Sequence, residues 1–154
     1  MTRNCLRQIA FVLTAAAIMS GCTGAEARKS SFIARGEQYM ASHDWQKARL
    51  EFRNALQIDP KDQKVQLLAA QAAERAGEYD EAAGRYRALL EQDRGNVAAR
   101  TALGRLYAGG GLAAEAIKLA EEGLSARPDD AGLLAVRGVA RAMRGDQMGA
   151  QQDA

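Results

Sequence analysis

The sequence predicts an all-α fold built from pairs of helices, and three observations lead to this prediction. Alanine supplies 33 of the 154 residues and aromatic residues only 5%, a composition that favours helices over strands. Apolar residues recur at spacings of three and four, which places them on one face of a helix. The chain also aligns with itself, without a gap, when it is shifted so that Gly36 falls on Ala70. These observations argue against an all-β sandwich or barrel.

The first segment, residues 1–21, is predicted to be a secretory signal peptide that is cut away. Arg3 and Arg7 precede an uncharged, mostly apolar run over residues 9–19, which is well short of the ~20 residues that a permanent membrane span needs. Small residues then lead up to Cys22. Two alternatives remain open: an ordinary cleavage site with an incidental thiol at Cys22, or a signal anchor that stays uncut.

The segment that ends at Cys22 resembles the bacterial lipobox, which implies that Cys22 becomes the acylated first residue of the mature chain. Met19 stands where that family usually has leucine. Thr23, rather than aspartate, follows the cysteine, and the resemblance to Gram-negative lipoproteins then implies sorting to the periplasmic face of the outer membrane. Residues 22–28 are small and polar, so they are predicted to form a tether.

Two helices are expected in each period of the repeat. In the first period Phe32, Gly36 and Tyr39 share one helix face, and Ala48 and Phe52 share a face of the next helix. Gly36 and Ala48 are predicted to be the contact pair between these helices, because small side chains let helix axes approach closely. Tyr39 and Phe52 would fill the space beside them.

A tight turn is expected between the two helices of a period. Asp44 is placed to accept hydrogen bonds from the free amides at the start of the second helix. The position of His43 is taken in the later periods by glycine, namely Gly77, Gly111 and Gly145. Glycine there suits a left-handed residue that ends the first helix. Asp59 and Pro60 then end the second helix of the first period.

Small residues recur in columns: Gly36, Ala70, Gly104 and Gly138 in one, and Ala48, Ala82, Ala116 and Ala150 in another. At these residues the chain resembles the tetratricopeptide repeat, a helix pair of about 34 residues. The resemblance implies a right-handed α-solenoid with repeats over 29–62, 63–96 and 97–130 and a partial fourth over 131–154. A solenoid end needs a polar capping face, so the sequence favours a fragment of a longer array over a frayed end.

The same resemblance implies a concave groove that is lined by the first helix of each repeat and accepts peptides. The groove-facing candidates are Glu37, Lys64, Gln71, Glu74, Arg75, Thr101 and Arg105. Any one of them can equally be an ordinary solvated helix residue. The basic and asparagine residues with which some relatives clamp a C-terminal carboxylate are not reproduced, which disfavours the binding of chaperone tails.

The composition argues against several classes of function. Without Arg3 and Arg7, 19 basic residues stand against 19 acidic ones, so the potential that attracts nucleic acid is missing. One histidine and two cysteines are too few for a metal centre. His43 beside Asp44 is interpreted as a capped turn rather than part of a catalytic triad, and residues 109–111 lack the strand and lysine of a phosphate-binding loop. We therefore expect no enzyme, metal, cofactor or small-molecule substrate.

These inferences predict a non-catalytic protein–protein interaction scaffold. It would be a lipid-anchored repeat lipoprotein of the bacterial envelope, acting in assembly, export or exopolysaccharide-linked sorting, with a protein or peptide partner in the groove. One alternative is a docking arm of a larger protein whose catalytic domain lies beyond residue 154. Another is a soluble periplasmic or cytosolic co-chaperone, which would not depend on Cys22 for its location.

Overall fold

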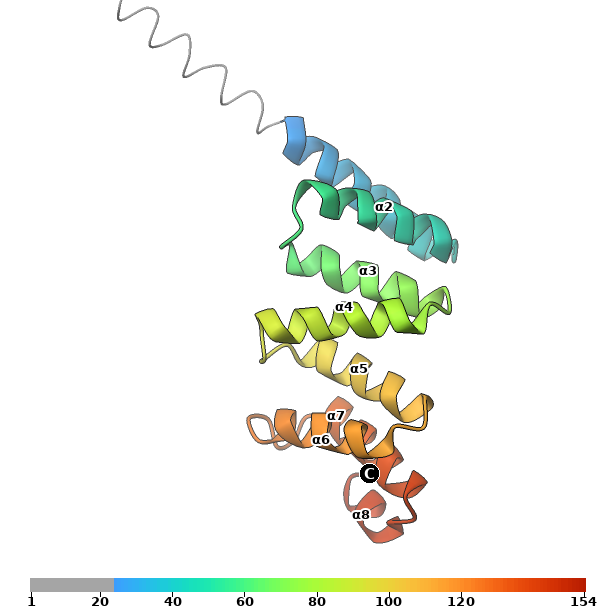
Figure 1. Ribbon diagram of the computed structural model, residues 1–154, viewed down its shortest axis with the longest axis vertical. Coiled ribbons are helices and arrows are strands. Elements are labelled where there is room, and N and C mark those ends of the chain that lie inside the picture. Colours follow the sequence, from blue (N-terminus) through green and yellow to red (C-terminus); the bar gives the residue numbers. More distant parts are fainter. Residues whose placement is uncertain (1–23) are drawn as a thin grey trace, which may run out of the picture. The chain divides into compact units, whose positions relative to one another are not determined.

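The computed structural model describes residues 24–154, and residues 1–23, with the predicted signal peptide and Cys22, lie outside the described residues (Figure 1). All regular secondary structure from residue 24 onward is helical, which confirms the all-α prediction. The chain divides into two compact units, Met1–Val65 and Gln66–Ala154. Among the described helices there is none with the length and apolar character required to cross a membrane.

The described part of the first unit contains a helix over residues 24–41 and α2, Trp45–Ile58. Residues 24–28 were predicted to be a tether but are the first turns of the helix. Lys29 explains the difference, because its buried ammonium lies 3.1 Å from Asp59, 3.2 Å from Asp62 and 3.2 Å from Glu26. This ion cluster holds the start of the helix against the segment that follows α2.

The contacts within this ion cluster shift the pKa values of Lys29 and Asp62. Hydrogen bonds from Lys29 to Asp59, Glu26 and Asp62 raise the pKa of the ammonium well above its usual range. Burial alone would raise the pKa of Asp62, but the Val65 amide and the Lys29 ammonium hold it below its usual value. Lys29 and Asp62 are therefore both charged at neutral pH.

The turns between paired helices have the predicted left-handed residue. The backbone φ angle is 61° at His43, and it is 81°, 79° and 83° at Gly77, Gly111 and Gly145. Asp44 caps α2 as predicted, since its carboxylate accepts the Lys47 amide at 3.3 Å. Asp59 follows the last residue of α2, so this helix also ends where predicted.

The Phe52 ring packs directly on Gly36, in agreement with its predicted role in filling space between the two helices. A Cβ atom added at Gly36 would lie 2.5 Å from the Phe52 ring, and its three nearest neighbours are all atoms of that ring. Ala48, the predicted contact partner of Gly36, is fully buried. The glycine makes room for this large aromatic ring between the two helices.

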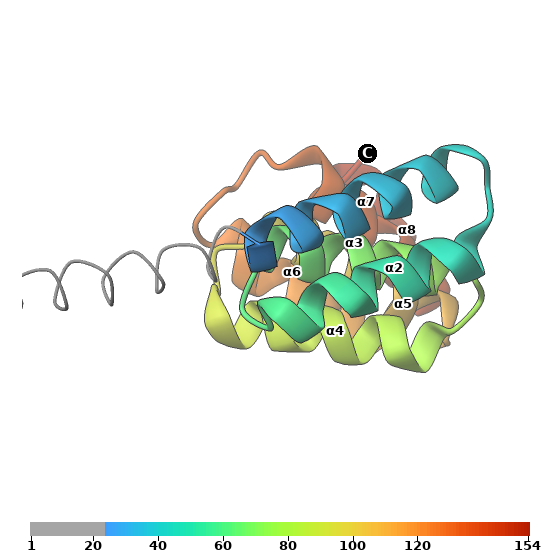
Figure 2. The ribbon, with the colours of Figure 1, turned by 90° about the horizontal axis from the view of Figure 1, so that it is seen from above.

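The second unit continues the pattern with six helices in its described residues, the first of which begins within the last residues of the first unit. They are α3 (Gln63–Arg75), α4 (Tyr79–Gln92), α5 (Val97–Gly109), α6 (Ala113–Leu124), α7 (Ala131–Met143) and α8 (Gln147–Gln152). Figures 1 and 2 show the turns α3–α4 and α5–α6 at one end of the helices and the loops α4–α5 and α6–α7 at the other. Neighbouring helices in this unit therefore run antiparallel.

Small side chains let the helices of the second unit approach closely. The core combines alanines with a few large residues, among them Tyr86, Leu89 and Leu103. A Cβ atom added at Gly104 of α5 would lie 2.7 Å from Cγ1 of Val136 on α7. At Gly104 the column thus marks a close contact between the first helices of two successive repeats, where a larger side chain would overlap Val136.

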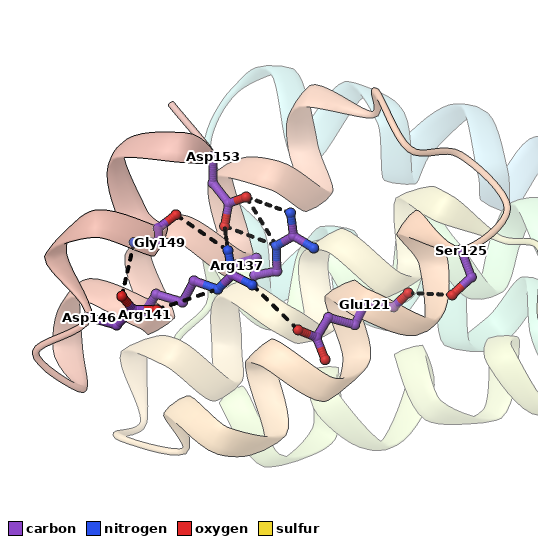
Figure 3. A network of polar contacts seen from close by, with 7 residues as sticks. All are labelled: Glu121, Ser125, Arg137, Arg141, Asp146, Gly149 and Asp153. Atoms are coloured by element: carbon purple, nitrogen blue, oxygen red, sulfur yellow. Dashed lines mark hydrogen bonds and ion pairs between the residues drawn. The ribbon is translucent and has the colours of Figure 1, made fainter.

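An ion network joins α7 to the end of α8 (Figure 3). The carboxylate of Asp153 is only 1% exposed; it accepts from Nε of Arg137 at 2.9 Å and lies 3.0 Å from Nη1 of Arg141. Arg141 also approaches Glu121 of α6 at 3.6 Å. The hydrogen bonds from Arg137, helped by Arg141, hold the pKa of Asp153 below its usual range.

Candidate peptide groove

In the first unit, the predicted groove residues Glu37 and Lys64 form an ion pair. Nζ of Lys64 lies 3.8 Å from Oε1 of Glu37, and the side chains of Lys64 and Glu37 are 75% and 50% exposed. A pair this exposed is screened by water and contributes little to stability. Both side chains can therefore exchange partners with a ligand at a small cost in free energy.

In the second unit, Glu74 of α3 and Arg105 of α5 are brought together. Nη2 of Arg105 lies 3.2 Å from Oε1 of Glu74, and the other carboxylate oxygen accepts the Tyr86 hydroxyl at 2.8 Å. Tyr86 is fully buried, and burial together with the Glu74 carboxylate raises the pKa of the phenol well above its usual range. Glu74 is thus held from the core side, whereas Arg105 is 60% exposed at the surface.

The other predicted groove residues have separate surroundings. Gln71 and Arg75 lie on α3, half-buried and exposed respectively, and neither lines the hollow described next. Thr101 lies half-buried on α5, one turn before Arg105. Of the seven candidates, Thr101 and Arg105 are the two that line the hollow between α5 and α7.

This hollow has a volume of about 330 Å³. Its lining is almost entirely apolar, with the Thr101 hydroxyl and the Arg105 guanidinium as the polar side-chain groups: Thr101, Arg105, Ala108, Gly109, Gly132, Ala135, Val136 and Val139. A Cβ atom added at Gly132 would lie 3.1 Å from Cγ2 of Thr101, so the floor is tightly packed at that point. The hollow can accept one aliphatic side chain beside a positively charged rim.

Sequence reasoning missed the α7 wall of this hollow. Val139 occupies the position of Arg105 in the next repeat, and Ala135 occupies that of Thr101, so both belong to the rows in which the candidates were chosen. Val139 is 56% exposed, and Met143, one turn later, is 52% exposed. The signal was present in the repeat itself, since continuing the same rows into the fourth repeat finds both Ala135 and Val139.

The lining of the hollow is suited to binding rather than to catalysis. Arg105 is its only charged side chain, and no base lines the hollow beside the Thr101 hydroxyl to activate it. Within residues 24–154, no three His, Cys, Asp or Glu side chains are placed to hold a metal ion. The arrangement offers apolar surface and one cation, which is the chemistry of a contact with another chain.

A family model described as tetratricopeptide repeat matches residues 39–84 and 73–138. The chain belongs to the tetratricopeptide repeat family. The matched residues extend from the end of the first helix to α7 and include most of both walls of the hollow. Tetratricopeptide repeats are typically non-catalytic scaffolds for protein–protein interaction, and the apolar hollow agrees with that role.

Solved structures of other tetratricopeptide repeat proteins have the same fold. A protein from Parabacteroides merdae superposes with a TM-score of 0.76 at 19% identity, covering 82% of this chain and 51% of its own. A thermophilic protein from Thermus thermophilus gives 0.69 at 19% identity, covering 81% and 70%. MamA from Desulfovibrio magneticus RS-1 gives 0.75 at 13% identity, covering 82% and 71%.

These likenesses establish the fold alone, because identities this low say nothing of a shared partner. The chain spans about half the length of the Parabacteroides protein. No curated protein sequence matches the chain. The choice of partner therefore has to be argued from the residues of this chain.

Proposed function

We propose that this tetratricopeptide repeat protein is a scaffold that binds a segment of another envelope protein in the hollow between α5 and α7. The observation that carries the proposal is the apolar lining of the hollow, which is open to solvent beside a rim whose charge is already paired. An aliphatic side chain of the partner would fill the space beside Ala135 and Val139. Arg105 is 60% exposed at the rim, and its guanidinium N–H groups that are not bonded to Glu74 would donate to a carboxylate of the same segment.

We further propose that Cys22 is acylated and holds the repeats at the periplasmic face of the outer membrane. The support comes from the sequence: a short apolar run over residues 9–19, small residues before the cysteine, and Thr23 after it. The first helix already includes residue 24, which leaves a short connection between Cys22 and the first repeat. Two residues span at most ~7 Å of extended chain, so the acylated cysteine would hold the first repeat close to the bilayer.

Photo-crosslinking from the groove tests the binding proposal. A photoreactive amino acid at Thr101 or Val139 is expected to capture a distinct envelope protein in living cells. The matched control places the same group at Lys118, which is exposed on α6 and does not line the hollow. Capture from Lys118 but not from the hollow would overturn the groove assignment.

Acyl labelling and membrane fractionation test the proposed lipid anchor at Cys22. The native chain is expected to incorporate labelled palmitate and to fractionate with the outer membrane, and Cys22→Ala is expected to lose both. Cys5→Ala is the matched control, because Cys5 lies in the segment that is predicted to be removed. Unchanged labelling in Cys22→Ala would remove the lipoprotein proposal and leave the groove proposal intact.

Among the envelope processes, assembly, export and exopolysaccharide-linked sorting are all compatible with such a scaffold, and we favour the last. The identity of the protein captured from Thr101 or Val139 distinguishes these processes. The alternative of a docking arm for a catalytic domain beyond residue 154 would be supported by capture of the substrate of that domain rather than of an assembly or export protein.

A further inference from the structure

The face of α7 that borders the hollow carries the longest uncharged row of exposed side chains in the described part of the second unit. Four residues at steps of four form this row, and all are exposed: Ala131, Ala135, Val139 and Met143. The corresponding row of α5 includes Thr101 and Arg105. The charged side chains of α7 point elsewhere, since Arg137 and Arg141 are bound to Asp153 (Figure 3).

The row is small in its first half and large in its second half. Ala131 and Ala135 leave shallow depressions near the start of α7, and Val139 and Met143 project near its end. If two copies of α7 lie antiparallel, with a two-fold axis near residue 137, Val139 of each copy faces Ala135 of the other. In the same register Met143 faces Ala131. Each projection meets a depression, which is the self-complementarity that an isologous interface needs.

The charges at the two ends of α7 agree with this register. Asp129 is exposed just before the helix, and Arg144 is exposed just after its last residue. Neither side chain has an ion-pair partner within the described residues. The antiparallel arrangement brings Arg144 of each copy next to the acidic start of the other copy's helix. Opposite charges therefore meet at both ends of the row, which also disfavours the parallel arrangement, and Arg105 at the side of the row has Glu74 as its ion-pair partner.

We propose that α7 pairs with α7 of a second copy of this chain in an antiparallel, two-fold symmetric dimer. The inference rests on the proposed function in that both use the face of α7 beside the hollow. Because Ala135 and Val139 would be covered in the dimer, a second copy and a partner segment exclude each other. Self-association then controls access to the hollow through the protein's local concentration.

Sedimentation velocity of the full chain, in a density-matched mild detergent over a concentration series, tests the proposal. The native chain is expected to form a dimer, and Val139→Glu is expected to raise the dissociation constant by at least about tenfold, because it buries a carboxylate between the two rows. Leu50→Glu is the matched control, since Leu50 is an exposed aliphatic residue of α2 in the first unit, 51% exposed. Circular dichroism checks that each variant keeps its helices.

A charge exchange tests the register. Asp129→Arg and Arg144→Asp are each expected to weaken the dimer, and the double variant is expected to restore it, because the opposite charges meet again. A chain that stays monomeric throughout the series would overturn the proposal. An equal loss in Leu50→Glu, or a double variant no stronger than the single ones, would overturn it as well.

The outcomes separate this inference from the proposed function. Capture of a different protein from Thr101 by a chain that does not dimerise would remove the inference and leave the function. A dimer that follows the predicted variants, together with no foreign protein captured from the hollow, would support the inference and remove the function. Capture of a different protein from Met143 by a monomeric chain would show that the α7 face has another occupant, which also contradicts the dimer.

Discussion

The face formed by the first helices of the repeats has two different chemistries in the second unit. Between α3 and α5 it is polar, because Glu74 pairs with Arg105 and also accepts the Tyr86 hydroxyl. Between α5 and α7 it is apolar, with Ala135 and Val139 lining an open hollow. The backbone repeats with the same period in both places. Side chains that the repeat leaves variable thus determine which part of the face is available to a partner.

The difference has an energetic reason. Water and salt screen the exposed charges, so the Glu74–Arg105 pair contributes little to folding and is already satisfied without a ligand. The exposed area of Val139 remains in contact with water until something covers it, and covering apolar area is favourable by roughly 25 cal/mol per Å². Covering the apolar part of the face with a partner therefore lowers the free energy more than covering the polar part does. Four substitutions, ordered from the largest expected effect to the smallest, test the packing, ion pairs and hydrogen bond that position the two parts of the face.

The largest effect is expected from Gly104→Val, which would push α5 away from α7. The new side chain would overlap Val136, whose Cγ1 lies 2.7 Å from the position of a Cβ atom. We expect a loss of about 3 kcal/mol in the free energy of unfolding, measured by urea denaturation. Val136→Ala in the same chain is expected to recover part of the loss by making room. A double variant as unstable as the single one would show that the two residues do not share this contact.

Asp153→Asn is expected to have the next largest effect, because it leaves Arg137 and Arg141 without their shared carboxylate. Both arginines are about one-fifth exposed, so water limits the loss to about 2 kcal/mol in the docking of α8 and the end of α7. The arginines lower the folded-state pKa of Asp153. Its contribution is then present above pH ~4 and disappears as the pH falls through the lowered value.

Hydrogen exchange of the α7 and α8 amides measures this pH dependence. The native chain is expected to protect these amides better than Asp153→Asn at neutral pH, and the difference is expected to narrow in acid. A difference that stayed constant into strong acid would contradict the assignment to an ionised Asp153. Asp146→Asn at the start of α8 is a useful comparison, because asparagine also caps a helix and the change removes only an exposed charge 3.9 Å from Arg141, while the buried carboxylate stays in place.

Tyr86→Phe is expected to destabilise the second unit by about 1 kcal/mol, since it removes one hydrogen bond to Glu74 and keeps the buried ring. Thermal denaturation measures the change. The variant also sharpens the contrast between the two parts of the face, because Glu74 then keeps Arg105 as its ion-pair partner. If Tyr86→Phe causes the same loss in a chain that already carries Glu74→Met, which has no oxygen acceptor, the hydrogen bond to Glu74 is not the cause.

Arg105→Met is expected to have the smallest effect on stability, less than about 0.5 kcal/mol, because the guanidinium is 60% exposed. The same variant is expected to reduce photo-capture from Val139 if the partner carries a carboxylate beside its apolar side chain. Arg105→Lys keeps the charge and is expected to retain most of the capture. Equal capture by all three chains would remove Arg105 from the site and leave the apolar hollow.

Local structure followed the sequence closely. The left-handed turn at His43 and its glycine counterparts, the Asp44 cap and the end of α2 at Asp59 were all predicted. Each depends on the conformational preferences of a few consecutive residues, which a sequence displays directly. The helices α3, α5 and α7 begin at the same position of successive repeats for the same reason.

Contacts between distant segments were harder to predict. The small, polar composition of residues 24–28 predicts a tether, because the partners that stabilise their helix through Lys29, namely Asp59 and Asp62, lie far along the chain. How closely the Phe52 ring approaches Gly36 depends on the angle and separation of the helices. Neither quantity can be read from spacing alone.

The repeat period, the helices and their turns were determined by the sequence itself, since they depend on interactions within a few residues. The tertiary structure alone decided that Arg105 would be paired with Glu74, and that Val139, one repeat later in the same row, would remain exposed beside a hollow. The physical reason is that the free energy of an exposed side chain depends on which groups other helices bring within a few ångströms of it.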